Sequence, residues 1–153
     1  RWGADMLELD VQASADGRCM VIHDALVDRT TDGTGPVAGM TFAELRELDA
    51  GYRFTADGGA TFPFRGQGVR IPTIEEVLEA LPAIRITVEV KAGAAQAPLF
   101  EAIRRFNARD RVIAAGMFDR DRSLFGTYDG AISGFNIEQL LKRLERRLGV
   151  GER

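Results

Sequence analysis

Apolar and polar residues alternate along the opening of the chain, which is typical of a β-strand with two different faces. In residues 6–12 (MLELDVQ) the aliphatic side chains share one face, and Glu8 and Asp10 share the other. A second β-prone run follows at residues 18–23 (RCMVIH), and the Asp16-Gly17 pair between the two runs is a strong signal for a hairpin turn. The pattern therefore predicts two antiparallel strands at the start of the chain.

The length of that turn sets which residues of the hairpin face each other. If Asp16-Gly17 alone forms the loop, Asp10 lies directly opposite His23. Directly opposed side chains project from the same face of a sheet, with Cβ atoms about 5 Å apart. A two-residue turn thus predicts that Glu8, Asp10 and His23 converge on one face, and a slip by one residue would break this pairing.

Helical and strand patterns alternate along the rest of the chain. The pairs Thr41 with Glu44 and Thr73 with Glu76 are capping boxes, so each predicts the start of a helix. Such alternation favours an α/β fold with a parallel sheet or barrel. A complete (β/α)8 barrel needs about 250 residues, so this chain is expected to supply part of one. Further elements are predicted as strands at 85–91, 111–116 and 131–133, and as helices at 98–106 and 137–148.

The polar faces of the first strand and of the strand at 85–91 carry the candidate chemistry. Glu8 and Asp10 are two residues apart, and Glu89 from the other strand completes a set of three carboxylates. Ligation by oxygen alone favours Mg²⁺ or Ca²⁺ over zinc. Lys91 is suited to neutralise a phosphate oxygen beside the metal, and His23 to donate a proton to a leaving alkoxide. Together these are the parts of a metal-assisted phosphodiester hydrolase.

Simpler interpretations of the same residues stay open at this point. A strand that alternates aliphatic residues with Glu8 and Asp10 is typical of a sheet with one solvated face. Glu89 and Lys91 form an ion pair of little energetic value in many proteins. A lone histidine such as His23 is more often packed or exposed than catalytic.

Composition excludes several other classes of protein. Hydrophobic residues make up 45% of the 153 residues and charged residues 28%, as in ordinary globular domains. No apolar run approaches the roughly 20 residues of a membrane-spanning helix, so no transmembrane segment is predicted. The net charge of −3 argues against a nucleic-acid partner. Cys19 is the one cysteine, which excludes a disulfide within the chain and a cysteine-rich zinc site.

Several motifs in a fixed order resemble the glycerophosphodiester phosphodiesterase family, over residues 3–91. This resemblance is more specific than any single motif, because all the motifs follow in the family's order. The matching motifs are Glu-x-Asp at 8–10, His-Asp at 23–24, Arg-Thr-Thr-x-Gly-x-Gly at 29–35, Leu-Asp-Ala-Gly at 48–51, Ile-Pro-Thr-x-Glu-Glu from 71 and Glu-x-Lys at 89–91.

The resemblance implies a fold and a reaction. It implies a TIM (β/α)8 barrel of the phospholipase-C-like phosphodiesterase type, present here as one partial domain over residues 1–153. It also implies that residues from about 25 to 70 form a small insertion, after the second strand of the hairpin, that caps the site. The expected activity is hydrolysis of a small-molecule glycerophosphodiester to glycerol 3-phosphate and an alcohol.

The family's site residues also map onto this chain. Glu8, Asp10 and Glu89 correspond to the ligands of one divalent metal, Ca²⁺ or Mg²⁺. His23 corresponds to the second catalytic histidine, which is the expected general acid. Lys91 corresponds to the active-site lysine that binds the phosphate.

The chain departs from the family at its start. The family opens with a strand that carries His-Arg-Gly, and these 153 residues contain neither that motif nor a second histidine. The first residue is Arg1, and beyond Asp129 the last strands of the family's barrel are absent or unrecognisable. We therefore expect a domain truncated at both ends and inactive by itself. Three alternatives remain: a sphingomyelinase-D-like enzyme, a phosphoinositide-phospholipase-like enzyme, and a chain that binds metal without turnover.

Overall fold

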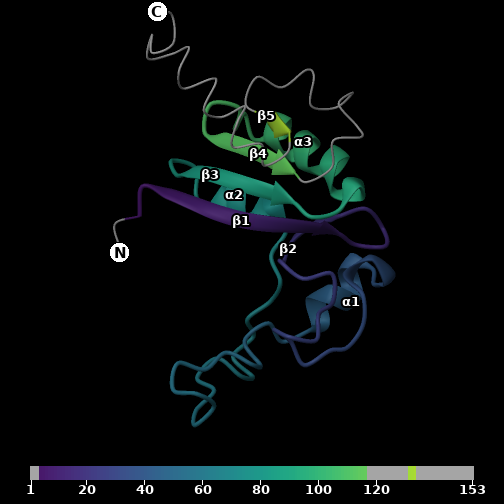
Figure 1. Cartoon of the computed structure of the whole chain (residues 1–153), viewed down its shortest axis with the longest axis vertical. Coiled ribbons are helices and arrows are strands. Elements are labelled where there is room, and N and C mark those ends of the chain that lie inside the picture. Colours follow the sequence, from purple (N-terminus) through teal and green to yellow (C-terminus); the bar gives the residue numbers. More distant parts are fainter. Residues whose placement is uncertain (1–3, 117–130, 134–153) are drawn as a thin grey trace, which may run out of the picture.

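The computed structural model describes residues 4–116 and 131–133, and within them five strands form one sheet. The strand order is β2-β1-β3-β4-β5 (Figure 1). β2 is antiparallel to β1, and all the other neighbours are parallel. The predicted helix at 137–148 lies outside the described residues. The strands are β1 (Met6–Ala13), β2 (Cys19–Val21), β3 (Arg85–Val90), β4 (Val112–Gly116) and β5 (Ala131–Ser133).

Two of the three described α-helices begin where the capping boxes predict. Thr41 caps α1, and Thr73 caps α2, each with the expected glutamate three residues later. α3 begins earlier than predicted, because a 3₁₀ turn leads directly into it. No described helix has the length and apolar character needed to cross a bilayer. The helices are α1 (Phe42–Glu47), α2 (Ile74–Ala80) and α3 (Gln96–Arg105), with 3₁₀ turns η1 (Val37–Gly39) and η2 (Gly93–Ala95).

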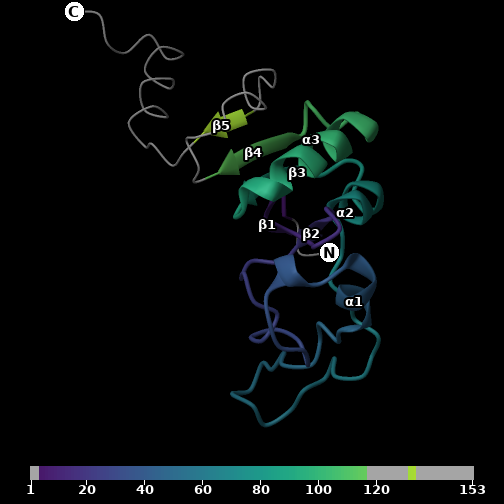
Figure 2. The ribbon, with the colours of Figure 1, turned by 90° about the vertical axis from the view of Figure 1, so that its right-hand side faces the viewer.

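The main core lies between one face of the sheet and the helices α2 and α3, which cover that face (Figure 2). Each fully buried aliphatic side chain contributes roughly 1.5–3 kcal/mol. Because side chains alternate along a strand, burying this face turns Glu8, Asp10 and Glu89 toward the opposite one. The core includes Val11, Ile86, Val88, Val90, Val112 and Ala114 from the strands, and Ile74, Leu78, Leu99 and Ile103 from the helices.

Residues 22–72 leave the sheet between β2 and α2 and form a lobe beside it (Figure 1). The lobe begins and ends at β2, since the amide of Val21 donates to the carbonyl of Pro72 at 2.8 Å. Asp49 closes the loops of the lobe by accepting hydrogen bonds from the amides of Gly51 and Gly66. A separate small core holds the lobe together, made of Met20, Ile22, Val27, Val37, Leu45 and Ile71.

The register of the hairpin differs by one residue from the prediction. Val11 pairs with Val21, so in this register position 22 lies opposite Asp10. The predicted direct pairing of Asp10 with His23 is therefore wrong, and β2 ends before His23 is reached.

The extra loop residue explains the shift. The amide of Ser14 donates to the carbonyl of Arg18 at 3.0 Å, which leaves three residues, 15–17, in the turn. The hydroxyl of Ser14 closes the loop by accepting from the amide of Arg18 at 2.8 Å and donating to Asp16 at 2.6 Å. Gly17 has a φ of 78°, the left-handed conformation that three-residue hairpin loops require.

The close approach of two loop segments in the lobe makes Gly51 sensitive to substitution. A Cβ atom at this position would lie 2.5 Å from the carbonyl oxygen of Phe64, which is backbone and cannot rotate away. We expect Gly51→Ala to lower the free energy of unfolding by about 1–3 kcal/mol. Urea titration followed by circular dichroism measures this change. Gly93→Ala is the control, because its Cβ would meet open space; equal losses in both variants would contradict the steric explanation.

Candidate active site

Three carboxylates converge on the polar face of β1 and β3. The two strands are parallel neighbours in which Asp10 pairs with Glu89. Glu8 lies two residues before Asp10 on β1, opposite Thr87. One carboxylate oxygen from each of Glu8, Asp10 and Glu89 lies within 4.8 Å of the others. The register between neighbouring strands therefore brings together residues that are 79 or more positions apart in the sequence.

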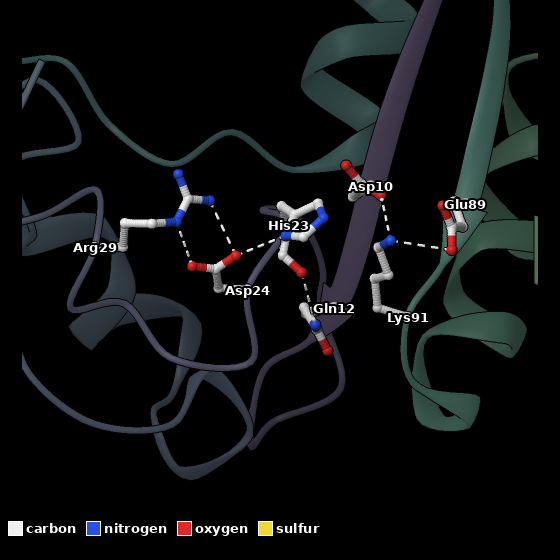
Figure 3. Close-up of polar contacts among 7 residues, drawn as sticks. All are labelled: Asp10, Gln12, His23, Asp24, Arg29, Glu89 and Lys91. Atoms are coloured by element: carbon white, nitrogen blue, oxygen red, sulfur yellow. Dashed lines mark hydrogen bonds and ion pairs between the residues drawn. The ribbon is translucent and has the colours of Figure 1, made fainter. Parts of the chain in front are cut away.

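Lys91 places its charge between two of these carboxylates. Its Nζ lies 3.0 Å from Asp10 Oδ1 and 3.0 Å from Glu89 Oε1 (Figure 3). The Lys91 amide also donates to the carbonyl of Val11, which continues the pairing with β1 beyond the end of β3. The hydrogen bond to Glu89, followed by the one to Asp10, raises the pKa of Lys91 above its ordinary value. The side chain therefore stays cationic at neutral pH.

The donor set fits a hard divalent cation. All three groups offer carboxylate oxygens, the ligands that Ca²⁺ and Mg²⁺ prefer. Two ligand atoms on one ion can be no farther apart than twice the metal–oxygen distance, which is about 4.6–5.2 Å for Ca²⁺ and about 4.0–4.2 Å for Mg²⁺. The 4.8 Å limit on these oxygens lies within the range for Ca²⁺.

His23 reaches the same face although it pairs with no strand. Its carbonyl accepts a hydrogen bond from Nε2 of Gln12 at 3.1 Å. Gln12 is buried and follows Asp10 by two residues, so it lies on the same face of β1. Figure 3 shows the imidazole ring of His23 between Asp24 and the part of β1 that carries Asp10. The bend after β2, anchored by Gln12, thus holds the backbone of His23 against β1, with the ring on the side that carries Asp10.

The other edge of the His23 ring is held by a charged pair at the start of the lobe. Nδ1 of His23 lies 2.6 Å from Asp24 Oδ1. Arg29 donates to both oxygens of Asp24, at 2.5 Å and 2.9 Å. The hydrogen bond from Arg29, followed by that from His23, holds the pKa of the Asp24 carboxyl well below its usual range. Asp24 is therefore ionised at neutral pH.

Three residues around His23 were not among the predicted site residues. Asp24 and Arg29 stand inside motifs that were recognised, but no local pattern shows that their side chains meet. Gln12 continues the two-residue spacing of Glu8 and Asp10, and this spacing was the signal available for it. Their hydrogen bonds depend on how the lobe folds back onto β1.

The chain is similar in sequence to glycerophosphodiester phosphodiesterases. The model of the glycerophosphoryl diester phosphodiesterase family matches residues 1–146, well beyond the range 3–91 in which the motifs are evident. The glycerophosphodiester phosphodiesterase of Caldanaerobacter subterraneus subsp. tengcongensis is 42% identical over 118 residues, which cover 72% of this chain and 45% of that protein. The chain spans about half the length of the curated relatives it matches.

Solved structures confirm the predicted fold, a partial (β/α)8 barrel. A glycerophosphodiester phosphodiesterase from Agrobacterium tumefaciens has a TM-score of 0.71 at 33% identity, over 82% of this chain and 51% of that one. An Oleispira antarctica phosphodiesterase, solved in complex with the product sn-glycerol-3-phosphate, also has a TM-score of 0.71. It is 22% identical, over 94% of this chain and 61% of that chain. At 22% identity, the similarity to the Oleispira antarctica structure supports the fold alone.

The position of Lys91 between two carboxylates makes its contribution to stability dependent on pH. We expect Lys91→Met to lower the free energy of unfolding by about 1 kcal/mol at neutral pH, because Asp10 and Glu89 lose their shared cation. The raised pKa of Lys91 means that this stabilisation is complete below the ordinary lysine value of about 10.4 and is lost as pH rises through the higher folded value. The difference between wild type and variant should therefore shrink only above about pH 10.4.

Urea titrations in EDTA between neutral pH and about pH 11.5 measure that difference, over the range in which lysine deprotonates. Arg85→Met is a matched control, because Arg85 is an exposed cation at the first position of the same strand. A difference between wild type and Lys91→Met that stays flat above the lysine pKa would contradict the proposed source of the stabilisation.

Proposed function

The chain belongs to the glycerophosphoryl diester phosphodiesterase family, and we propose that the protein containing it hydrolyses glycerophosphodiesters to sn-glycerol 3-phosphate and an alcohol. The observation that carries this proposal is the convergence of three carboxylates and a lysine on one face of β1 and β3. The family match, together with the 42% identical relative that is named a glycerophosphodiester phosphodiesterase, supports a small substrate that contains glycerol and phosphate.

In this proposal the carboxylates form a metal site. Glu8, Asp10 and Glu89 would hold one Ca²⁺ or Mg²⁺, and the ion would supply Lewis-acid polarisation of a phosphoryl oxygen. Lys91 binds the phosphate. An ammonium group has three N–H donors, and two of them are directed at Asp10 and Glu89. Among the residues that the structure describes, the third has no hydrogen-bond partner, so it is available to a phosphate oxygen while the lysine keeps both contacts.

His23 is proposed to act as the general acid. In the overall reaction a water oxygen bonds to phosphorus, the ester bond to the alcohol breaks, and His23 gives its proton to the departing alcohol oxygen. A base must take the proton of the attacking water. His23 is the one histidine among the 153 residues, so a histidine base must come from outside them. We therefore expect the isolated chain to bind metal with little or no turnover.

The lobe is proposed to cap the site. Residues from about 25 to 70 make up most of it, and Arg29 near its start reaches the Asp24 carboxylate that contacts His23. The lobe therefore begins at the edge of the proposed catalytic group. A cap over the glycerol moiety would select for small diesters and keep bulk solvent away from the reacting phosphate, apart from the one water that attacks it.

The metal site predicts a measurable loss of affinity when one ligand is removed. Asp10→Asn keeps the size of the side chain but removes the charge, so we expect Ca²⁺ or Mg²⁺ to bind at least about tenfold more weakly. Isothermal titration calorimetry on the 153-residue chain measures both ions. Asp28→Asn is the control, because Asp28 is a carboxylate of the lobe that accepts from Gly35 outside the cluster. Equal affinities in wild type and Asp10→Asn would refute the assigned ligand set.

The reaction itself is tested on the full-length product of the gene that encodes these residues. We expect hydrolysis of glycerophosphocholine, with release of glycerol 3-phosphate, and a fall in kcat of at least about a hundredfold in His23→Ala, since general acid catalysis contributes about 10²–10⁴. Sphingomyelin and phosphatidylinositol are the comparison substrates for the two alternative enzymes, which gain no support from the relatives found. Preference for either lipid, or an unchanged rate in His23→Ala, would contradict the proposal.

A further inference from the structure

Three side chains form a continuous path from the lobe to the ring of His23. Arg29 contacts both oxygens of Asp24, and Asp24 Oδ1 contacts Nδ1 of His23 (Figure 3). The first two residues belong to the lobe side of the bend after β2, and none of the three is a member of the carboxylate cluster. Both oxygens of Asp24 are therefore engaged, which leaves that carboxylate little freedom to turn.

The chemistry of the contact decides where the imidazole proton sits. An ionised carboxylate accepts hydrogen bonds and has none to donate. A separation of 2.6 Å between Nδ1 and Oδ1 is a short, charge-assisted hydrogen bond. Nδ1 must therefore be the donor, and in the neutral ring the proton stays on Nδ1 while Nε2 is bare.

The orientation of the ring gives this tautomer a consequence. The edge of the His23 ring that faces away from Asp24 is directed toward the part of β1 that carries Asp10 (Figure 3). Gln12 holds the backbone of His23 by donating a hydrogen bond to the His23 carbonyl. With its backbone fixed to β1 and its Nδ1 fixed to the lobe, the ring can exchange a proton with a group at the carboxylate cluster only through Nε2.

We propose that Asp24, held in place by Arg29, is a positioning residue that fixes the tautomer of His23 and reserves Nε2 for proton transfer. This inference rests on the proposed role of His23 as the general acid and deepens it, because it names Nε2 as the nitrogen whose proton passes to the alcohol. In the protonated ring both nitrogens carry a proton, and Nδ1 keeps its own in the hydrogen bond to Asp24. An imidazole without such a partner populates both tautomers. Part of the ring population would then have the two nitrogens in the wrong roles for the reaction.

The tautomer can be measured directly, because His23 is the one histidine in the chain. Nitrogen-15 NMR of the histidine-labelled 153-residue chain, about two units above the ordinary imidazole pKa of about 6.5, gives one ring and distinguishes protonated from bare nitrogens. In the wild type we expect the proton on Nδ1. In Asp24→Ala we expect the ratio of Nδ1–H to Nε2–H to fall by about tenfold or more, given the strength of hydrogen bonds to charged groups.

Two further variants make the test specific. Asp28→Ala is the matched control: it removes a nearby lobe carboxylate that accepts from Gly35 but does not contact His23, and its tautomer ratio should equal that of the wild type. Arg29→Gln keeps Asp24 but loses the charged partner, so we expect an intermediate ratio. Backbone amide spectra report whether each variant is folded. If Asp24→Ala does not fold, the wild-type tautomer and the Arg29→Gln ratio decide the question.

The outcomes separate this inference from the proposed function. A wild-type ring with its proton on Nε2, or a ratio that is unchanged in folded Asp24→Ala, overturns the positioning role. A ratio that falls equally in Asp28→Ala also overturns it, because the effect would then be general loosening of the lobe. A locked tautomer together with loss of hydrolysis in the full-length Asp24→Ala, seen in kcat rather than KM, supports it. A locked tautomer in a full-length protein without hydrolysis would reject the proposed function alone.

Discussion

The parallel pairing of β1 with β3 is the constraint on which the site depends. It sets Asp10 beside Glu89 and leaves Glu8 within reach of both. Carboxylates gathered in this way repel one another, and a partly buried group loses hydration as well. The register persists because the opposite faces of the same strands are aliphatic and pack against α2 and α3. A one-residue slip would turn those aliphatic side chains away from the helices and the carboxylates into the core.

Charge compensation completes the arrangement. Lys91 extends from the end of β3 and contacts Asp10 and Glu89 together, so one cation serves two anions. This leaves the cluster of Glu8, Asp10, Glu89 and Lys91 with a formal charge of −2, which attracts a divalent cation. Two of the three carboxylates that would bind a metal are thus held together by the lysine that would bind the phosphate.

The lobe influences the site through its two attachments to the sheet. The chain leaves β2 through the bend at His23 and returns beside it, where Val21 donates to Pro72. Asp24 and Arg29 stand at the first of these attachments, so the fold of the lobe sets the orientation of the His23 ring. This explains how a histidine outside any strand acquires a defined position relative to the carboxylates on β1.

The sequence by itself determined the features that depend on near neighbours. Two-residue spacing placed Glu8 and Asp10 on one face of a strand, and capping boxes at Thr41 and Thr73 marked the helix starts. Tertiary structure alone decided the rest, because the energies involved come from residues far apart in the chain. The hairpin register depended on how Ser14 closes its loop, and the two-residue turn was the wrong expectation. The contacts of Lys91 arise only when β3 packs beside β1. The hydrogen bonds from Arg29 to Asp24 and between Asp24 and His23 arise only when the lobe packs beside β1.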